Sequence, residues 1–268
     1  MSELAKTTHF HGLGVDPDNP DRLLLATHHG VYTVHGSGNA ERLSRTRDDF
    51  MGFASHPTDR SVFLASGHPV GGGNLGLIAS RDGGRTWEKL SDGVGGPVDF
   101  HQLTVSPADP NVMFGVFGGI QQSSDGGQTW RRVGNAPEGL IDLTASSVRT
   151  NSLYAATQTG ILRSGDGGRN WRPSYADGAP TTLIHTTAGG VVYAYVIGQG
   201  FIRSAERERG WATLNPGLGA RYLLHLAEHP TNPDKLFAIA SDRTTNRPSI
   251  VQTDDGGVTW APLTPNEE

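Results

Sequence analysis

One short phrase occurs four times along the chain and limits what the chain can fold into. The copies are SRDGGRTW (residues 80–87), SSDGGQTW (123–130), SGDGGRNW (164–171) and TDDGGVTW (253–260). A fifth, degenerate copy, SAERERGW, ends at Trp211, and successive tryptophans are 43, 41, 40 and 49 residues apart. A repeat of about 40–50 residues is typical either of propeller blades or of helical arrays.

The local sequence pattern separates these two architectures. Segments such as RLLLATH (22–28) and KLFAIAS (235–241) are short, apolar and bounded by turn residues, which predicts strands. No long stretch has helical periodicity. The sequence therefore predicts an all-β fold, a six-bladed β-propeller of four-stranded antiparallel blades, as a single domain over residues 1–268. The expected blades are about 8–46, 47–95, 96–138, 139–177, 178–217 and 218–265.

The repeated phrase fits the pattern S/T-x-D-x-G-x-T/N-W, and with it the chain resembles Asp-box (BNR-repeat) propellers. The resemblance implies that each phrase is the hairpin between the third and fourth strands of a blade. An aspartate in such a turn accepts hydrogen bonds from backbone N–H groups, and a glycine supplies positive φ. We therefore interpret the aspartates of the four phrases as folding residues rather than ligands: Asp82, Asp125, Asp166 and Asp255.

Charge and composition exclude several classes of function. The net charge of −5 and the pI of about 6.1 argue against a nucleic-acid partner. The absence of cysteine excludes disulfides, thiolate ligands and a cysteine nucleophile. No apolar run is long enough for membrane insertion, and MSELAKTTHFHG lacks the apolar core of a signal peptide. We expect a cytoplasmic protein as encoded, or an exported one if a leader peptide has been removed.

Histidine and aspartate recur at equivalent positions of neighbouring blades. The blades can be aligned on the prolines that end their first strands: Pro17, Pro57, Pro107 and Pro230. Six residues earlier lie His11, Met51, His101 and Leu224, and eight residues earlier lie His9, Asp49, Asp99 and Tyr222. Residues two apart share a face of a strand. Because the first strand of a blade lines the central channel, these side chains should face it.

A second group of histidines follows the second strands, with His28 and His29 in ATHHG and His68 in SGHP. The first strand starts, and the second ends, on the same face of the ring. Both groups should therefore converge at one mouth of the channel, opposite the Asp-box hairpins. Four other histidines, His35, His56, His185 and His229, are expected to lie outside this cluster.

Imidazole and carboxylate groups on rigid strands suit a divalent first-row transition metal such as copper, zinc, iron or nickel. The same groups can also perform general acid–base chemistry. We expect a small-molecule ligand to bind at this mouth. The candidate metal ligands are His9, His11, His68 and His101, with His28 or His29 next. Asp49 and Asp99 are the candidate catalytic residues, further metal ligands or groups that orient ligands. The other half of the ring adds Asp142, His225 and Arg243, and Met51 completes the ligand-binding set.

Two other functions stay open. The motifs H-x-H-G, A-T-H-x-G, M-G-F, S-G-H-P and D-F-H, within residues 8–130, resemble small bacterial BNR-repeat propellers described as glycosylhydrolase-like or exo-sialidase-like. That resemblance implies a glycoside hydrolase or glycan-binding protein with Asp49 and Asp99 as its two carboxylates. Three arginines for a sialidase-type site cannot be placed on the inner strands. The third function is a non-catalytic scaffold for a protein partner, as in the sortilin-like and photosystem-assembly propellers that the Asp-boxes resemble.

Overall fold

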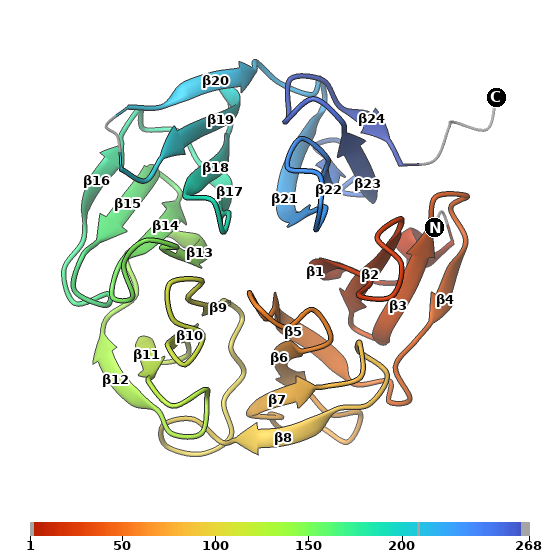
Figure 1. The fold of residues 1–268 in the computed structure, drawn as a ribbon, viewed down its shortest axis with the longest axis vertical. Coiled ribbons are helices and arrows are strands. Elements are labelled where there is room, and N and C mark those ends of the chain that lie inside the picture. Colours follow the sequence, from red (N-terminus) through yellow and green to blue (C-terminus); the bar gives the residue numbers. More distant parts are fainter. Residues whose placement is uncertain (1–2, 208–209, 264–268) are drawn as a thin grey trace.

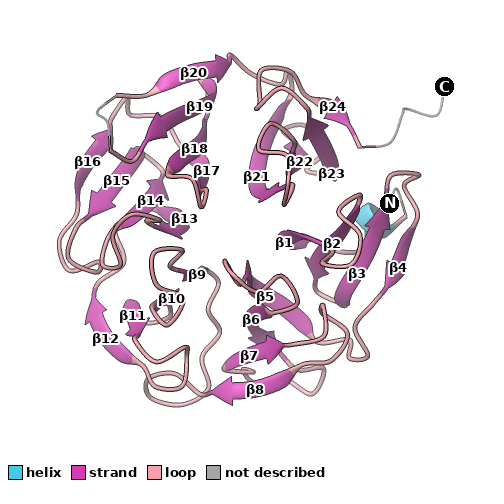
Figure 2. Ribbon diagram, in the orientation of Figure 1, coloured by secondary structure: helices cyan, strands magenta, loops and turns pink. Residues whose placement is uncertain are grey.

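The computed structural model describes residues 3–207 and 210–263. Six four-stranded antiparallel sheets surround a central channel like blades (Figure 1), which confirms the predicted six-bladed, all-β propeller. Within the described residues the only helix is α1 (Leu4–Thr7) (Figure 2). No described helix has the length and apolar character needed to cross a membrane.

The first three sheets follow the chain order. Sheet one contains β1 (Phe10–Val15), β2 (Arg22–Thr27), β3 (Gly30–His35) and β4 (Ala40–Arg42). Sheet two contains β5 (Asp49–Ser55), β6 (Phe63–His68), β7 (Leu77–Ser80) and β8 (Glu88–Ser91). Sheet three contains β9 (Leu103–Val105), β10 (Met113–Val116), β11 (Ile120–Ser123) and β12 (Arg131–Gly134).

The other three sheets complete the ring. Sheet four contains β13 (Leu140–Ala145), β14 (Leu153–Thr157), β15 (Gly160–Ser164) and β16 (Arg172–Tyr175). Sheet five contains β17 (Thr181–Thr186), β18 (Val191–Val196), β19 (Gly200–Ala205) and β20 (Ala212–Asn215). Sheet six contains β21 (Arg221–Glu228), β22 (Leu236–Asp242), β23 (Pro248–Thr253) and β24 (Ala261–Pro262). Each sheet uses four consecutive strands, so the first and last blades meet without exchanging a strand among the described residues.

The hairpins formed by the repeated phrase are held by bonds within the phrase itself. In the first copy, the Asp82 carboxylate accepts hydrogen bonds from the Thr86 backbone N–H (2.9 Å) and the Thr86 hydroxyl (2.6 Å). The Ser80 hydroxyl accepts the N–H of Gly84 at 2.8 Å, and Gly84 has a φ of 90°. The indole N–H of Trp87 donates to the Gly84 carbonyl at 3.0 Å. These contacts occupy the aspartate in the turn, as its interpretation as a folding residue requires.

Two of the hairpin tryptophans, Trp87 and Trp130, pack against phenylalanines at or just before the innermost strands β5 and β9. Trp87 lies with its ring centroid 4.8 Å from that of Phe50, and Trp130 lies 4.8 Å from Phe100. Both phenylalanines are fully buried. Each directly follows a candidate aspartate, Asp49 or Asp99. The repeated tryptophan therefore anchors the strand entries that carry the candidate carboxylates.

Candidate functional site

His11 owes its position to a β-bulge in the innermost strand of the first blade. Phe10 pairs with Thr27 and Gly12 pairs with Ala26, so His11 is the extra residue between them. A bulge redirects the side chain of its extra residue. Gly12 allows β1 to approach β5, because a Cβ atom there would lie 2.5 Å from the Cβ atom of Phe53. The H-x-H-G motif is thus a bulged histidine followed by a glycine at a close strand contact.

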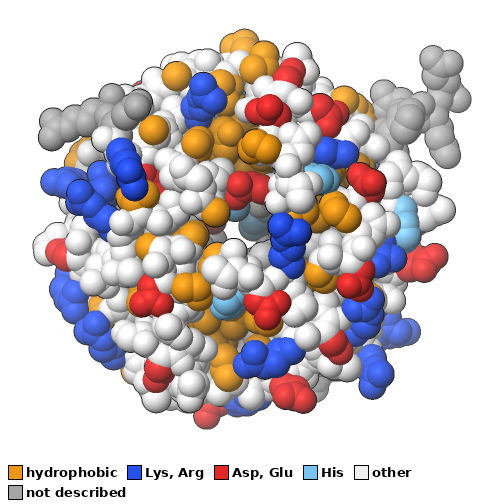
Figure 3. Space-filling view, viewed as in Figure 1, with side chains coloured by type: hydrophobic (Ala, Val, Ile, Leu, Met, Phe, Trp, Pro, Cys, Tyr) orange, Lys and Arg blue, Asp and Glu red, His pale blue; other side chains and the backbone are white. Residues whose placement is uncertain are grey.

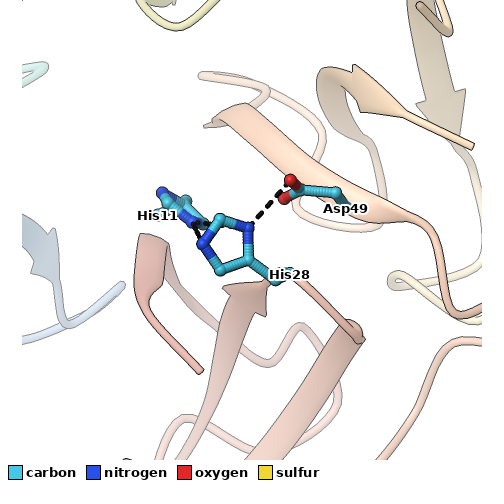
Figure 4. Close-up of side chains that lie close together, drawn as sticks. All are labelled: His11, His28 and Asp49. Carbon is cyan, nitrogen blue, oxygen red and sulfur yellow. Dashed lines mark hydrogen bonds and ion pairs between the residues drawn. The ribbon is translucent and has the colours of Figure 1, made fainter. Parts of the chain in front are cut away.

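His11, His28 and Asp49 meet at the channel, each carried by a different segment of blades 1 and 2 (Figure 4). His28, just after β2, donates from Nδ1 to Asp49 Oδ2 at 2.8 Å. The Nε2 atom of His11 lies 3.1 Å from His28 Nε2, with the two rings at 69°. The ring of His9 has its centroid 5.4 Å from that of His28. Among the residues that the structure describes, His11, His28 and Asp49 are the only set of three such ligand atoms lying within 4.8 Å of one another.

The surroundings of this cluster keep the His11 imidazole neutral. Burial, followed by the neighbouring His28, lowers the pKa of His11 to about 4, while Asp49 opposes the shift. His11 is therefore neutral at pH 7 and keeps a nitrogen lone pair. The other carboxylate oxygen of Asp49, Oδ1, is buried and has no hydrogen-bond partner within the described residues. A buried carboxylate oxygen of this kind is a position where a cation or a water is stabilised.

Asp99 forms a second cluster with His68 and His101. Its Oδ2 atom lies 2.7 Å from His101 Nε2 and 3.1 Å from His68 Nε2, while Asp99 is only 5% exposed. His68 also donates from Nδ1 to the Gly73 carbonyl at 2.8 Å. That carbonyl is the main cause of a raised pKa of His68, to which Asp99 adds. Both nitrogens of His68 are therefore bonded, whereas the His101 side chain is 61% exposed to the channel mouth or solvent.

A buried serine holds the segment that carries Asp99. The Ser66 hydroxyl, on β6, accepts the Phe100 backbone N–H at 2.9 Å and donates to the Gly76 carbonyl at 2.8 Å. Ser66 is fully buried. Asp99 is thus fixed between this bond and the packing of Phe100 on Trp130.

The remaining predicted residues lie elsewhere. Of the two adjacent histidines, His28 makes the contact with Asp49, and His29 is exposed. Met51 is buried within blade 2. Arg243 is exposed on the loop after β22, where its backbone N–H donates to the Ala220 carbonyl.

The Asp142 carboxylate bonds backbone N–H groups of two blades and is not available as a ligand. Its Oδ1 accepts the Leu143 N–H at 2.8 Å, and its Oδ2 accepts the Ile184 N–H of the next blade at 2.9 Å. Burial raises the pKa of Asp142 to about 6. Gln102 and Thr182 also donate to backbone carbonyls of the following blade, at 2.6 Å each. Among the described residues, the histidine–carboxylate pairs lie on blades 1 to 3, apart from His185–Glu228 between blades 5 and 6.

The channel widens into a cavity of about 470 Å³, and a hollow at the centre of the ring is visible in Figure 3. Asp142 and His225 line it, and burial lowers the pKa of His225 to about 4. His56, His185 and His229, expected outside the mouth cluster, line this cavity together with Arg60 and Glu228. The sequence feature that could have identified two of these residues is the position of His56 and His229, each directly before the proline that ends a first strand.

Comparisons with known proteins bear on the fold alone. No protein-family model matches the sequence, and no curated protein matches it. Solved structures similar to this chain include a GH74 xyloglucanase from Xanthomonas campestris, with a TM-score of 0.60, 19% identity and coverage of 95% of this chain and 45% of that one. The GH74 enzyme of Niastella koreensis has a TM-score of 0.65, 14% identity and the same coverage. YCF48 from Cyanidioschyzon merolae has a TM-score of 0.56 and 16% identity, covering 95% of this chain and 85% of that one. The chain spans less than half the length of the two GH74 enzymes.

Proposed function

We propose that this propeller binds one divalent first-row transition metal at the mouth of its channel, with His11 and His28 as ligands and His9 as a third. The observation that carries the proposal is the approach of the His11, His28 and Asp49 ligand atoms to within 4.8 Å of one another. Imidazole is a good ligand for copper, zinc, iron and nickel alike. The donor set therefore defines the class of metal rather than one element.

The two imidazoles lie at about the separation of two metal ligands. Two ligands on a tetrahedral ion with bonds of 2.0–2.1 Å lie about 3.3 Å apart, and His11 Nε2 lies 3.1 Å from His28 Nε2 and 3.3 Å from His28 Nδ1. Because His11 Nε2 is about equally far from both nitrogens of the His28 ring, one ring must turn before both lone pairs point at one ion. The Nδ1–H of His28 donates to Asp49, which leaves Nε2 as the atom with the lone pair. A carboxylate behind a histidine is the usual way in which a metal-binding imidazole is oriented and made more basic.

The Asp99 cluster would supply proton transfer next to this centre. A bound metal acts as a Lewis acid on a ligand at an open position. His101 is accessible and is held by a buried carboxylate, which is the arrangement of a general acid or base. His68 is less suited to be a ligand, because both of its nitrogens already have partners. In this proposal His101 transfers the proton, Asp99 orients His101, and His68 holds Asp99 in place.

Glycoside hydrolysis is favoured less by the same geometry. Asp49 and Asp99 each accept a short hydrogen bond from an imidazole, at 2.8 and 2.7 Å. One carboxyl group of a glycosidase must itself carry the proton that it donates to the leaving group. The similarity to GH74 enzymes, at 14–19% identity, is a similarity of fold, and a shared fold does not establish a shared reaction.

Elemental mass spectrometry on protein purified without a histidine tag tests the proposal. We expect about one metal equivalent in the wild type and in His29→Ala, whose exposed histidine adjoins His28, and little metal in His11→Ala and His28→Ala. Full metal content in both of the latter variants would reject the proposal. His101→Ala separates two roles, because retained metal places His101 with Asp99 in proton transfer and lost metal makes it a ligand.

A further inference from the structure

The channel holds a second pocket whose chemistry differs from that of the His/Asp mouth. In each blade the first strand runs from the mouth toward the opposite face, so residues that follow β5 and β21 lie at that face. There His56, Arg60 and His229 line the cavity of about 470 Å³. Among the described residues that line it, none is a proposed metal ligand. A cavity of a few hundred Å³ suits a small molecule.

The two histidines present fixed hydrogen-bond donors to this cavity. His56 Nδ1 accepts the backbone N–H groups of Thr58 and Asp59, at 3.4 and 3.1 Å. His229 Nδ1 accepts those of Thr231 and Asn232, at 3.3 and 3.2 Å. Because Nδ1 accepts in both rings, the proton is on Nε2. Each imidazole therefore offers an Nε2–H group as its remaining polar atom.

The turns themselves do not require histidine. In blade 1 the equivalent residue is Asp16, whose carboxylate accepts the N–H groups of Asp18 and Asn19 at 2.8 and 3.3 Å. In blade 4 the Ser146 hydroxyl accepts the N–H groups of Val148 and Arg149 at 3.2 and 3.1 Å. Any short acceptor caps these turns. Histidine at two of the positions adds an N–H donor to a residue that lines the cavity, which turn formation does not explain.

Arg60 brings a positive charge to the same opening. Its Nη2 atom donates to the Pro230 carbonyl at 3.0 Å, so the side chain reaches from blade 2 to blade 6 past the end of blade 1. This contact uses one of the five guanidinium N–H groups, and the others stay available for a ligand. A guanidinium beside further N–H donors is the usual recognition group for a carboxylate.

The acidic side chains that line the cavity already have partners. Asp16 bonds Arg22 at 2.8 Å, and Glu228 bonds His185 at 3.0 Å. Asp142 accepts two backbone N–H groups. None of these three carboxylates bonds Arg60, whose guanidinium contacts the Pro230 carbonyl, so its charge stays available to a ligand. The deeper wall is largely apolar and includes Leu13, Phe53, Leu103, Leu143, Ile184 and Leu226.

We propose that this cavity binds a small organic carboxylate. Its carboxylate group is held by the Nε2–H groups of His56 and His229 and by the Arg60 guanidinium, and its apolar body lies against the inner strands. Its three binding groups are not proposed metal ligands, so the site does not depend on the metal centre, although Gly12 and His225, which also line the cavity, lie beside that centre.

Titration of ¹⁵N-labelled protein with benzoate and hexanoate, followed by NMR, tests this site, with benzamide and hexanamide as neutral isosteres. We expect the acids to bind at least about tenfold more tightly than the amides, with shifts at cavity residues. Arg60→Gln should weaken acid binding by about tenfold or more, the effect of losing a charged hydrogen bond. His229→Asp copies the blade 1 turn and keeps its cap, but it replaces a donor by a negative charge and should abolish acid binding. Arg172→Gln, exposed on β16, is the matched control and should bind as the wild type does.

Three results would overturn the proposal. The first is that acids and amides bind equally or that neither binds. The second is that Arg60→Gln and His229→Asp keep wild-type affinity for the acids. The third is that His28→Asn, which lacks a proposed metal ligand, loses acid binding, since that would assign the acids to the metal centre.

Discussion

Replacing Gly12 by alanine tests how closely the inner strands of blades 1 and 2 are packed beside the candidate site. The added Cβ atom would lie 2.5 Å from the Cβ of Phe53, whereas ordinary contacts begin near 3.4 Å. The Cβ of Phe53 cannot rotate away because it is fixed to the β5 backbone. The Phe53 ring is itself stacked on Phe63, with centroids 5.3 Å apart. The strands must therefore separate by about 1 Å.

The size of the effect follows from two opposing terms. Forcing an extra methyl group into a packed interior costs about 1–3 kcal/mol of unfolding free energy. Alanine also restricts the unfolded chain, which stabilises by about 0.4–1 kcal/mol where the backbone φ suits alanine, and the φ of Gly12 is not positive. The steric term is larger. We expect a net loss of about 1–2 kcal/mol, which lowers Tm by about 2–4 °C in a chain of this size.

Guanidinium denaturation followed by circular dichroism measures this loss. Gly36→Ala is the matched control, because a Cβ atom at Gly36 meets nothing within 4 Å and its φ is also not positive. We expect Gly36→Ala to be as stable as the wild type or slightly more so. Equal midpoints for Gly12→Ala and Gly36→Ala would refute the close packing of β1 on β5. Metal content should fall in Gly12→Ala as well, because the bulge that positions His11 moves.

Three further predictions concern single side chains. Ser66→Ala should lower the free energy of unfolding by about 1–3 kcal/mol in the same assay, because the buried Phe100 N–H loses its acceptor; no change would contradict the role of Ser66 in holding the Asp99 segment. The pKa of His11 is about 4 in the folded protein, against an ordinary 6.5, so the unfolded chain binds this proton first on acidification. The stability that neutral, buried His11 contributes is complete above pH 6.5 and is lost as the pH falls toward 4. Metal-free His11→Gln should therefore show a flatter dependence of unfolding free energy on pH between 6.5 and 4 than the metal-free wild type. The bonds of Asp125 to the Thr129 hydroxyl, the Thr129 N–H and Ser123 hold its pKa at about 2, below the ordinary 3.8. This carboxylate stabilises the fold fully above pH 3.8 and progressively less toward pH 2, so acid unfolding of Asp125→Asn, followed by circular dichroism, should depend less on pH there; an unchanged acid transition would argue against it.

The blades could be predicted because their signals are local in sequence. The Asp-box bonds join residues two to four apart, as between Asp82 and Thr86, so the phrase forms the same hairpin wherever it occurs. Spacing of the phrase then gives the number of blades. The alignment on strand-ending prolines also predicted that Asp49, Asp99 and their histidines share a mouth, because they occupy equivalent positions near the starts of first strands and residues two apart share a strand face.

The partners within the mouth could not be predicted from these rules. His28 and His29 are adjacent and chemically identical, and only the position of β5 decides that His28 bonds Asp49. Asp142 looked like a channel ligand, yet both of its oxygens accept backbone N–H groups, one of them from the next blade. Such choices depend on how blades pack against each other, which relates residues 21 positions apart for His28 and Asp49 and 42 positions apart for Asp142 and Ile184.

The sequence by itself determined the propeller, the number of its blades and the turns that close its hairpins. Each of these follows from hydrogen bonds and strand alternation within a few residues. Tertiary structure alone decided that His11 sits in a bulge beside His28, that Asp99 joins His68 to His101, and that Arg60 reaches the Pro230 carbonyl. The Arg60 contact forms only when the ring closes, and the other two depend on how neighbouring strands and blades pack, which the spacing of the residues in the sequence does not record.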